Sequence, residues 1–366
     1  MIVIVENLMN TTTKSTSIDN KKLEEFVMKS VGDMGSSLSA LMILLGDRLG
    51  LYKALNEYGP LKSEELAQKT DTSERYIREW LASQAAADYI SYDATSKKFT
   101  LSPENALVLA EENSPVFIMG AYQIIRSLFK SEDKFAEIFK TGKGLRWGEH
   151  HHDLFEGTAR YFKPGYISNL VQSWIPSLEG IEDKLKKGAK VADIGCGYGL
   201  STTIMAKSFP NSQFYGYDNH APSVEAAKEN AIKENVKSNT NFLVVSANES
   251  IGNDYDLIAF FDCLHDMGDP LGALKFAKQS LRSDGTCMIV EPLANDKLED
   301  NLNPMGKISY AVSSIVCVPN SLADNGPALG AQAGEQKIKD LVSEAGFTKF
   351  RRTTQTPLNA VYEVRP

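Results

Sequence analysis

Val191-Ala-Asp-Ile-Gly-Cys-Gly-Tyr-Gly199 has the pattern of a short apolar strand that enters a turn with three glycines, and it predicts a helix over residues 200–208 directly afterwards. The next apolar segment, Phe214-Tyr-Gly-Tyr-Asp218, predicts a second strand that ends in a carboxylate. Glycines let the backbone turn tightly and approach a bound nucleotide. An acid at the tip of the following strand can accept hydrogen bonds from ribose hydroxyls. Together the two segments predict a nucleotide site at the carboxyl edge of a parallel sheet.

The glycine spacing narrows the class of nucleotide. Gly195, Gly197 and Gly199 form GxGxG rather than the dinucleotide pattern GxGxxG, and Asp193 stands two residues ahead of the first glycine. This variant resembles motif I of the S-adenosylmethionine (SAM) dependent methyltransferases. The resemblance implies SAM as cofactor and S-adenosylhomocysteine as product. Another nucleotide-binding fold and an inactive relic of this one remain as alternatives.

Composition excludes several other classes. The chain has 366 residues, 42% of them hydrophobic, and this length favours two domains over one. A net charge of −8 argues against general affinity for nucleic acid or acidic membranes. The four cysteines form no CxxC pair and no histidine spacing suits zinc, so we expect reduced thiols, a cytoplasmic location and no bound metal. The apolar residues 1–5 are too few to span a bilayer and lack the features of a signal peptide.

The order of predicted elements gives the domain organisation. From residue 188 onward strands and helices alternate, which predicts an α/β doubly wound parallel sheet, the Rossmann-like architecture. Ahead of it we expect two helices and a short hairpin over residues 63–102, the order of a winged helix. The expected parts are a flexible tail (1–20), a winged-helix dimerisation domain (21–115), a helical connector covering the active site (116–180) and a SAM-binding domain (181–366).

The winged helix raises the question of DNA binding. A recognition helix normally carries a surplus of Lys and Arg for the phosphates. Here Arg75 and Arg78 alternate with Glu74 and Glu79, and residues 82–87 are uncharged and mostly alanine. This surface favours dimerisation and roofing of the active site over DNA binding, and DNA binding remains the alternative.

Polar residues at the strand ends define the expected cofactor site. In open α/β sheets the ligand lies beyond the carboxyl ends of the strands, so side chains from five strands should converge on one crevice. In related folds the segment before the first strand covers the methionine end of SAM, which adds Tyr166. The expected cofactor-binding residues are Asp193, Gly195, Gly197, Gly199, Asp218, Asn219, Ala247, Asn248, Asp262 and Tyr166.

The catalytic prediction rests on Leu264-His-Asp-Met-Gly-Asp269. This segment resembles the HDW-D stretch of plant-type small-molecule O-methyltransferases, which implies His265 as general base and Glu291 as the acid that orients it. Asp269 is the better local partner, because the adjacent Asp266 would point elsewhere at the start of a helix. A second acid of that family falls opposite Gln332 or Glu335. The alternative role of His265 is to cap the following helix.

A second resemblance covers most of the chain, from about Leu41 to Pro366. It is to a group of bacterial and archaeal winged-helix methyltransferases, including a mycobacterial one, often described as regulators. The similar blocks are Arg75-Tyr-Ile-Arg-Glu-Trp-Leu81, Phe162-Lys-Pro-Gly-Tyr166, Cys263-Leu-His-Asp-Met-Gly-Asp-Pro270, Asp300-Asn-Leu-Asn-Pro304 and Ala328-Leu-Gly-Ala-Gln-Ala-Gly-Glu335. The resemblance implies a homodimer with one SAM per subunit.

The remaining features bear on the acceptor. Residues 305–319 form an apolar insertion after the fifth strand, and one face of it is expected to line the acceptor site. His150-His151-His152 cannot present three metal ligands from one helix face, so a place in the wall of the acceptor pocket is favoured over a metal site. The sequence thus predicts methylation of a small organic acceptor, most simply at oxygen. Methylation at sulfur or nitrogen and a SAM-responsive DNA-binding regulator are the alternatives.

Overall fold

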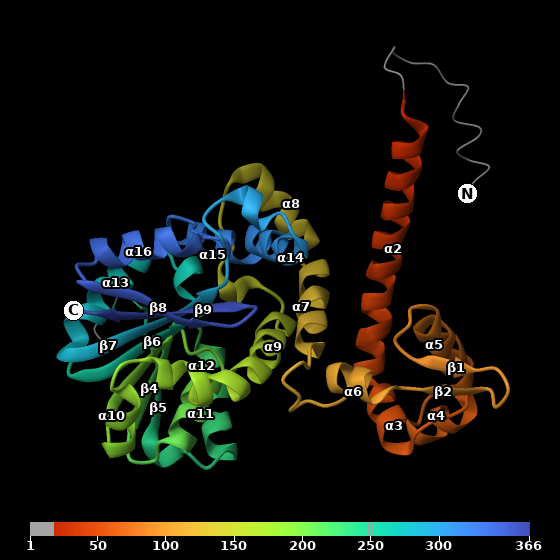
Figure 1. The fold of residues 1–366 in the computed structure, drawn as a ribbon, viewed down its shortest axis with the longest axis horizontal. Coiled ribbons are helices and arrows are strands. Elements are labelled where there is room, and N and C mark those ends of the chain that lie inside the picture. The colour runs from red at the N-terminus through yellow and green to blue at the C-terminus, as the bar shows by residue number, and fades with distance from the viewer. Residues whose placement is uncertain (1–17, 248, 250–251) are drawn as a thin grey trace. The chain divides into compact units, whose positions relative to one another are not determined.

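The computed structural model describes residues 18–247, 249 and 252–366. The expected tail therefore lies largely outside the described residues, as does Asn248. The chain divides into two compact units, Met1–Thr100 and Leu101–Pro366 (Figure 1), which we describe separately. This division falls after the predicted hairpin, fifteen residues ahead of the expected boundary at residue 115, because the next helix belongs to the second unit.

The first unit is helical with a small hairpin. Its elements are α2 (Asn20–Arg48), α3 (Leu51–Tyr58), α4 (Ser63–Lys69), α5 (Glu74–Ala86), β1 (Ser91–Asp93) and β2 (Lys98–Thr100). Asp19 caps α2 by accepting from the backbone N–H groups of Lys21 and Lys22. Strands β1 and β2 pair antiparallel, so the helix–turn–helix–hairpin order expected of a winged helix is present.

Helices open the second unit. They are α6 (Pro103–Leu109), α7 (Met119–Phe129), α8 (Glu132–Thr141), the short η1 (Trp147–Glu149), α9 (Asp153–Asn169), the π-helix η2 (Leu170–Trp174), η3 (Ile175–Ser177) and α10 (Ile181–Lys187). Gly120 of α7 and Gly157 of α9 let these two helices cross closely, since a Cβ at Gly120 would lie 2.6 Å from the carbonyl oxygen of Gly157. The expected helical connector therefore forms part of the second unit.

A seven-stranded sheet forms the centre of the second unit. Its strands are β3 (Lys190–Ile194), β4 (Gln213–Asp218), β5 (Thr240–Val244), β6 (Tyr255–Phe261), β7 (Leu281–Pro292), β8 (Lys349–Gln355) and β9 (Asn359–Arg365). The strand order is β5-β4-β3-β6-β7-β9-β8. The first five strands run parallel, and β9 and β8 add an antiparallel hairpin at one edge. The predicted α/β fold class is confirmed, and β3 and β4 lie where the sequence predicted the first two strands.

Helices cover both faces of this sheet (Figure 1). Because successive strand residues point to opposite faces, β3 sends Val191 to one core and Ala192 to the other. The first core packs against α10, α11 (Leu200–Ser208) and α12 (Ala221–Lys233). The second packs against α13 (Pro270–Ser280) and α16 (Gly334–Glu344). Burial on both faces explains why the strand segments read as continuous apolar runs.

The apolar insertion after β7 forms a helical segment above the carboxyl edge of the sheet. It consists of α14 (Pro304–Val312), the π-helix η7 (Ser313–Cys317) and α15 (Val318–Ala323). Asn320 and Ser321 hydrogen-bond the backbone carbonyls of Asp266 and Met267 at 3.0 and 2.8 Å. These bonds attach the insertion to the turn that follows β6.

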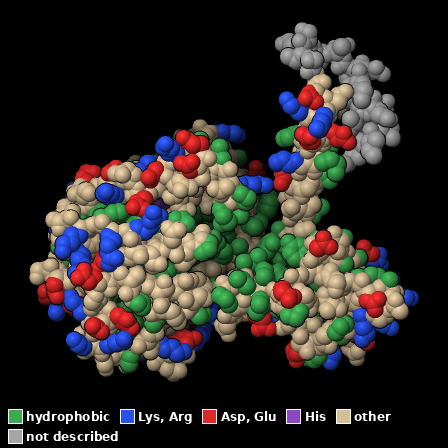
Figure 2. Space-filling model, viewed as in Figure 1, with side chains coloured by type: hydrophobic (Ala, Val, Ile, Leu, Met, Phe, Trp, Pro, Cys, Tyr) green, Lys and Arg blue, Asp and Glu red, His purple; other side chains and the backbone are tan. Residues whose placement is uncertain are grey.

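Surface charge, hydropathy and the cysteines each add one finding. On the visible face of residues 101–366, Lys, Arg, Asp and Glu side chains are interspersed (Figure 2). Within the described ranges, no helix has both the length and the apolar character that a bilayer span requires. All four cysteines are free.

Candidate active site

The carboxyl ends of β3, β4 and β6 open into a cavity of about 460 Å³. A volume in this range is typical of small-molecule and cofactor sites. The glycine turn, α9, the turn after β6 and α15 all contribute residues to its lining. The residues that line it are Trp147, Phe155, Thr158, Ala159, Phe162, Tyr166, Ile194, Gly195, Cys196, Gly197, Tyr198, Leu200, Ser201, Tyr217, Asp218, Asn219, Ser223, Val245, Ser246, Ala247, Phe261, Asp262, Cys263, Asp266, Met267, Gly268, Asp269, Asn320 and Asp324.

Asp218 joins the glycine turn to the end of β4. Its Oδ2 accepts from the backbone N–H of Gly197 at 2.9 Å, and its Oδ1 accepts from His220 N–H at 2.8 Å. Burial raises the pKa of this carboxyl group, and the two backbone donors oppose the rise. Asp218 therefore fixes the two loops that line the cavity floor. The neighbouring Asn219 and the expected Ala247 also line the cavity.

Asp193 has a different place from the one that its position in the motif suggested. Its carboxylate is buried behind the cavity wall, where Oδ2 accepts from the hydroxyls of Ser201 and Thr202, both at 2.6 Å. Burial raises its pKa to about 6, although the two hydroxyls act against this rise. The carboxylate thereby holds the first turn of α11 against β3, and it is not among the lining residues.

Gly199 also lies behind the wall. Its φ is +69°, and a Cβ at this position would lie 2.7 Å from Phe242 and 2.9 Å from Ala227. Gly195 and Gly197 line the cavity with φ of +71° and +51°. All three glycines thus have a left-handed backbone, and a Cβ would also meet α12 and β5 at Gly199 and Cys263 at Gly195, whereas Gly197 faces open space.

Asp262 supplies an unpartnered oxygen at the end of β6. Its Oδ1 accepts from Asn359 Nδ2 at 2.7 Å, while its buried Oδ2 has no hydrogen-bond partner among the described residues. The residue has a φ of +50°, and burial raises its pKa well above the usual range. Tyr166 lines the cavity nearby and packs on Phe261 at a ring-centroid distance of 5.5 Å. The unpartnered oxygen beside the cavity leaves a hydrogen-bonding position open to a ligand group.

His265, in the turn after β6, and Glu291, near the end of β7, form a buried pair. His265 Nδ1 lies 2.5 Å from Glu291 Oε2, and the other oxygen of Glu291 accepts from Leu264 N–H at 2.9 Å. Burial lowers the pKa of His265, but the Glu291 carboxylate and a contact with the Cys317 thiol outweigh it and raise the pKa well above the usual value. The imidazole is buried and is not among the lining residues. Glu291 therefore aligns the ring, and the Cys317 thiol of η7 contacts it.

The two aspartates of the same turn have separate positions. Asp269 is the N-cap of α13, where its Oδ1 accepts from Gly272 N–H at 2.8 Å, and it lines the cavity. Asp266 also lines the cavity, although the sequence favoured Asp269 over it. Burial raises the pKa of Asp266 to about 7. A 3₁₀ turn over Leu264–Asp266, in place of the start of an α-helix, directs this side chain to the cavity.

Several lining residues were not predicted from the sequence. Trp147 and Phe155 pack at a centroid distance of 5.3 Å, and Phe155 contacts the ring of His220 at 4.6 Å. The backbone N–H of Trp147 donates to Asn320 Oδ1 at 2.9 Å, which links this wall to α15. None of these positions belongs to a motif with fixed spacing. The aromatic content of the connector was the signal that could have pointed to them.

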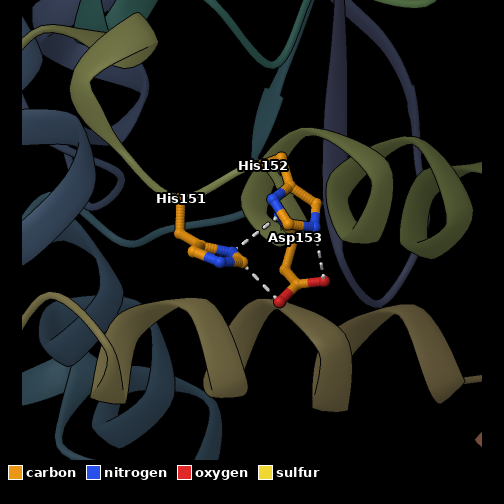
Figure 3. A group of neighbouring side chains, drawn as sticks. All are labelled: His151, His152 and Asp153. Atoms are coloured by element: carbon orange, nitrogen blue, oxygen red, sulfur yellow. Dashed lines mark hydrogen bonds and ion pairs between the residues drawn. The ribbon is translucent and has the colours of Figure 1, made fainter.

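The three consecutive histidines have separate surroundings. His150 is buried beside Phe135, and burial lowers its pKa to about 4. His151 and His152 face the Asp153 carboxylate at 3.1 and 3.6 Å (Figure 3). Arg126 and Lys130 contact the same carboxylate, and Lys130 Nζ lies 3.0 Å from His151 Nε2. Two cations on the acid and its neighbour favour an ion-pair cluster over a metal site, and none of the three histidines lines the cavity.

Two family comparisons agree with this geometry. Residues 185–346 match a family described as "Methyltransferase domain", and residues 37–111 match the "Rv2258c-like winged HTH domain". The chain therefore contains a methyltransferase domain. An N-terminal winged helix-turn-helix domain precedes it, so both parts of the predicted domain pairing are confirmed.

Curated relatives and solved structures extend the comparison of the methyltransferase domain. Ribosomal RNA small subunit methyltransferase C of Haemophilus influenzae is 27% identical in an alignment of 211 residues that covers 50% of this chain and 62% of that protein. The chain thus spans less than two thirds of the length of this relative.

Among solved structures, a protein of Nostoc punctiforme assigned as an O-methyltransferase has a TM-score of 0.71 at 22% identity, over 96% of this chain and 99% of that one. Mitomycin 7-O-methyltransferase has a TM-score of 0.70 at 17% identity, over 94% and 100%. Human N-acetylserotonin methyltransferase, solved in complex with SAM, has a TM-score of 0.66 at 15% identity, over 96% and 99%. At these identities the likeness establishes the shared fold.

Proposed function

We propose that the chain transfers a methyl group from SAM to the oxygen of a small organic acceptor. The observation that carries this proposal is the cavity, in which the glycine turn, Asp218 and the unpartnered oxygen of Asp262 meet at the carboxyl ends of β3, β4 and β6. SAM, when bound, supplies an activated methyl group and leaves as S-adenosylhomocysteine. The protein then has to align the acceptor, exclude water and accept a proton.

The residues present fit a cationic cofactor. SAM carries a sulfonium, an ammonium and a carboxylate group and is positive overall, and the described lining residues include five aspartates but no Lys, Arg or His. Such a wall attracts positive charge. In the proposal Asp218 and Asn219 hold the ribose, Ala247 faces the adenine, and Gly195, Gly197 and Tyr166 lie along the methionine end. Asp262 would accept a hydrogen bond from a donor group at the methionine end of SAM.

The proton acceptor in this proposal is His265. Glu291 occupies Nδ1, which leaves Nε2 to take the proton of the acceptor hydroxyl, and the carboxylate stabilises the imidazolium that results. Because the ring is buried and contacts the Cys317 thiol of η7, this contact has to open before the acceptor can reach Nε2. Asp269 supports this turn through its cap on α13.

A second candidate is a SAM-responsive DNA-binding regulator, since the N-terminal unit is a winged helix-turn-helix domain. On α5, the position of a recognition helix, Arg75 pairs with Glu79 at 2.6 Å and Arg78 pairs with Glu74 at 2.8 Å. The arginines that would contact phosphates thus have carboxylate partners within the same helix. A gel-shift titration at physiological salt, with and without SAM, tests this candidate, and no shift is expected.

The N-terminal unit instead supports a homodimer. Helix α2 presents large apolar side chains at the spacing of a coiled-coil seam, three or four residues apart. Their exposed fractions are 65% for Met34, 66% for Leu38 and 52% for Leu41. A second copy of the helix would bury this stripe, which is why the proposal is a homodimer with one active site per subunit.

Transfer of label from methyl-labelled SAM tests the proposed function. The purified protein is incubated with labelled SAM and a size-fractionated extract of the cells that produce it, beside the His265→Ala variant. Label in the small-molecule fraction with the wild type, strongly reduced with the variant, supports oxygen methylation. Equal labelling by both proteins points to a sulfur or nitrogen acceptor that needs no base. Label in macromolecules, or none despite SAM binding, refutes the proposal.

A further inference from the structure

The charge of the cavity wall is uneven. Asp218 and Asp262 lie at strand ends, where the cofactor is proposed to bind. Three more aspartates, Asp266, Asp269 and Asp324, come from the turn after β6 and the end of α15, on the side closed by the insertion. No cationic side chain lines either side within the described residues. When SAM occupies the part of the cavity near Asp218 and Asp262, the three aspartates of the insertion side still face the remaining space.

The three aspartates on the insertion side differ in how they are compensated. Asp269 accepts from Gly272 N–H at 2.8 Å, and Asp324 pairs with Arg146 at 3.1 Å. Asp266 forms no ion pair within the described part of the chain, and its side chain has Asn320 as a hydrogen-bonding neighbour. Burial is the main cause that raises the pKa of Asp266 to about 7. The charge of His265 lowers this pKa, and the charges of Glu291 and Asp218 raise it. Asp266 and Asp269 are therefore the two acids on this side that form no ion pair within the described residues, and Asp266 is the less exposed of the two.

We infer that the acceptor is a neutral or positively charged molecule rather than an anion, and that Asp266 is the residue that sets this preference. The inference rests on the proposed function, since it concerns the second substrate of the same cavity. A carboxylate or phosphate on the acceptor would enter a partly desolvated wall that offers it no cation, which is a costly arrangement. A protonated amine would instead give Asp266 the ion-pair partner that no lining side chain provides.

The test reads the charge of the methylated product directly, without knowledge of the acceptor. Wild-type protein is incubated with methyl-labelled SAM and the small-molecule fraction of the cell extract, residual SAM is removed enzymatically, and the labelled products are separated on anion- and cation-exchange resins at pH 7. We expect label to pass through the anion exchanger. Label retained mainly as anions, with good transfer, would overturn the inference and leave the proposed function intact.

A variant tests the role of Asp266. Asp266→Asn keeps the shape and the amide contact to Asn320 but removes the charge, and we expect the ratio of cationic to neutral labelled product to fall at least about tenfold, the scale of one desolvated charge pair. Asp340→Asn, on the exposed surface of α16, is the matched control and should leave the ratio unchanged. A wild-type ratio in Asp266→Asn, with an unchanged unfolding midpoint, would refute the assigned role.

A second outcome applies where the wild type labels only neutral products. The Asp266→Asn variant should then label more anionic product than the wild type, and no increase would also refute the role of Asp266. Absence of any labelled small molecule would refute the proposed function, and the inference with it.

Discussion

His265 Nδ1 and Glu291 Oε2 lie 2.5 Å apart in a buried pair that joins the turn after β6 to the end of β7. Because Glu291 also accepts from Leu264 N–H, one carboxylate fixes both the backbone of the turn and the direction of the imidazole. The same ring contacts Cys317 of η7 on its other side. The catalytic predictions follow from this arrangement, in which Glu291 aligns the His265 imidazole and Cys317 contacts it.

Replacement of either member of this pair should reduce the rate. His265→Ala should lower kcat by roughly 10²- to 10⁴-fold, the usual contribution of a general base. In Glu291→Gln the main cause of the raised His265 pKa is lost, so burial should lower that pKa. The base then becomes neutral at lower pH, and the acid limb of the pH–rate profile should move down. An unmoved limb in Glu291→Gln would show that another group titrates.

Two glycines of the turn should respond differently to a methyl group. Gly197→Ala meets open space and incurs only the cost of the left-handed backbone, about 1–2 kcal/mol. Gly199→Ala adds a clash with Phe242 and Ala227, so we expect a further loss of about 1–3 kcal/mol. Urea unfolding of both variants measures the difference. Equal losses would mean that the contacts around Gly199 relax freely.

Asp193 should make stability depend on pH. Its folded pKa is raised to about 6, so the folded state binds a proton that the unfolded chain releases near pH 4. The free energy of unfolding should therefore fall as pH rises from about 4 to about 6, by up to about 3 kcal/mol. Asp193→Asn cannot titrate and should lack this decline. Parallel stability curves for the two proteins over this range would contradict the prediction.

Loss of the Asp218 carboxylate should weaken cofactor binding. Asp218→Ala removes the proposed ribose acceptor together with the bonds to Gly197 and His220, and SAM affinity should fall by roughly 1–3 kcal/mol. Isothermal calorimetry with SAM gives the value, and Asp340→Asn serves as the reference. Unchanged affinity would show that the ribose of SAM does not bind at Asp218.

The exposed stripe on α2 should govern self-association. Leu38→Lys places a charge in the centre of the stripe, and we expect it to shift the protein from dimer to monomer in sedimentation equilibrium. Leu298→Lys, an exposed apolar position in the second unit, is the control and should remain dimeric. A monomeric wild type would remove the homodimer from the proposal.

Much of the fold follows from local sequence. The strand, the glycine turn and α11 are contiguous in the chain, and each local preference agrees with the next, so their positions could be predicted. Asp218 could be predicted for the same reason, because a strand end in a parallel sheet has a fixed edge. The side chain of Asp266 could not, since a 3₁₀ turn instead of an α-helix decides where it points. The wall formed by Trp147 and Phe155 carries no spacing rule at all.

The sequence by itself determined the class of fold, the strand ends that form the crevice and the pairing of a winged helix with a methyltransferase domain, because these depend on periodicity and turn chemistry over short stretches. The tertiary structure alone decided which candidate side chains line the cavity. Asp193, Gly199 and His265 do not line it, His265 contacts Cys317 of η7, and Asp266 lines it. Contacts between segments far apart in the chain set these positions, and no local pattern encodes how closely such segments pack.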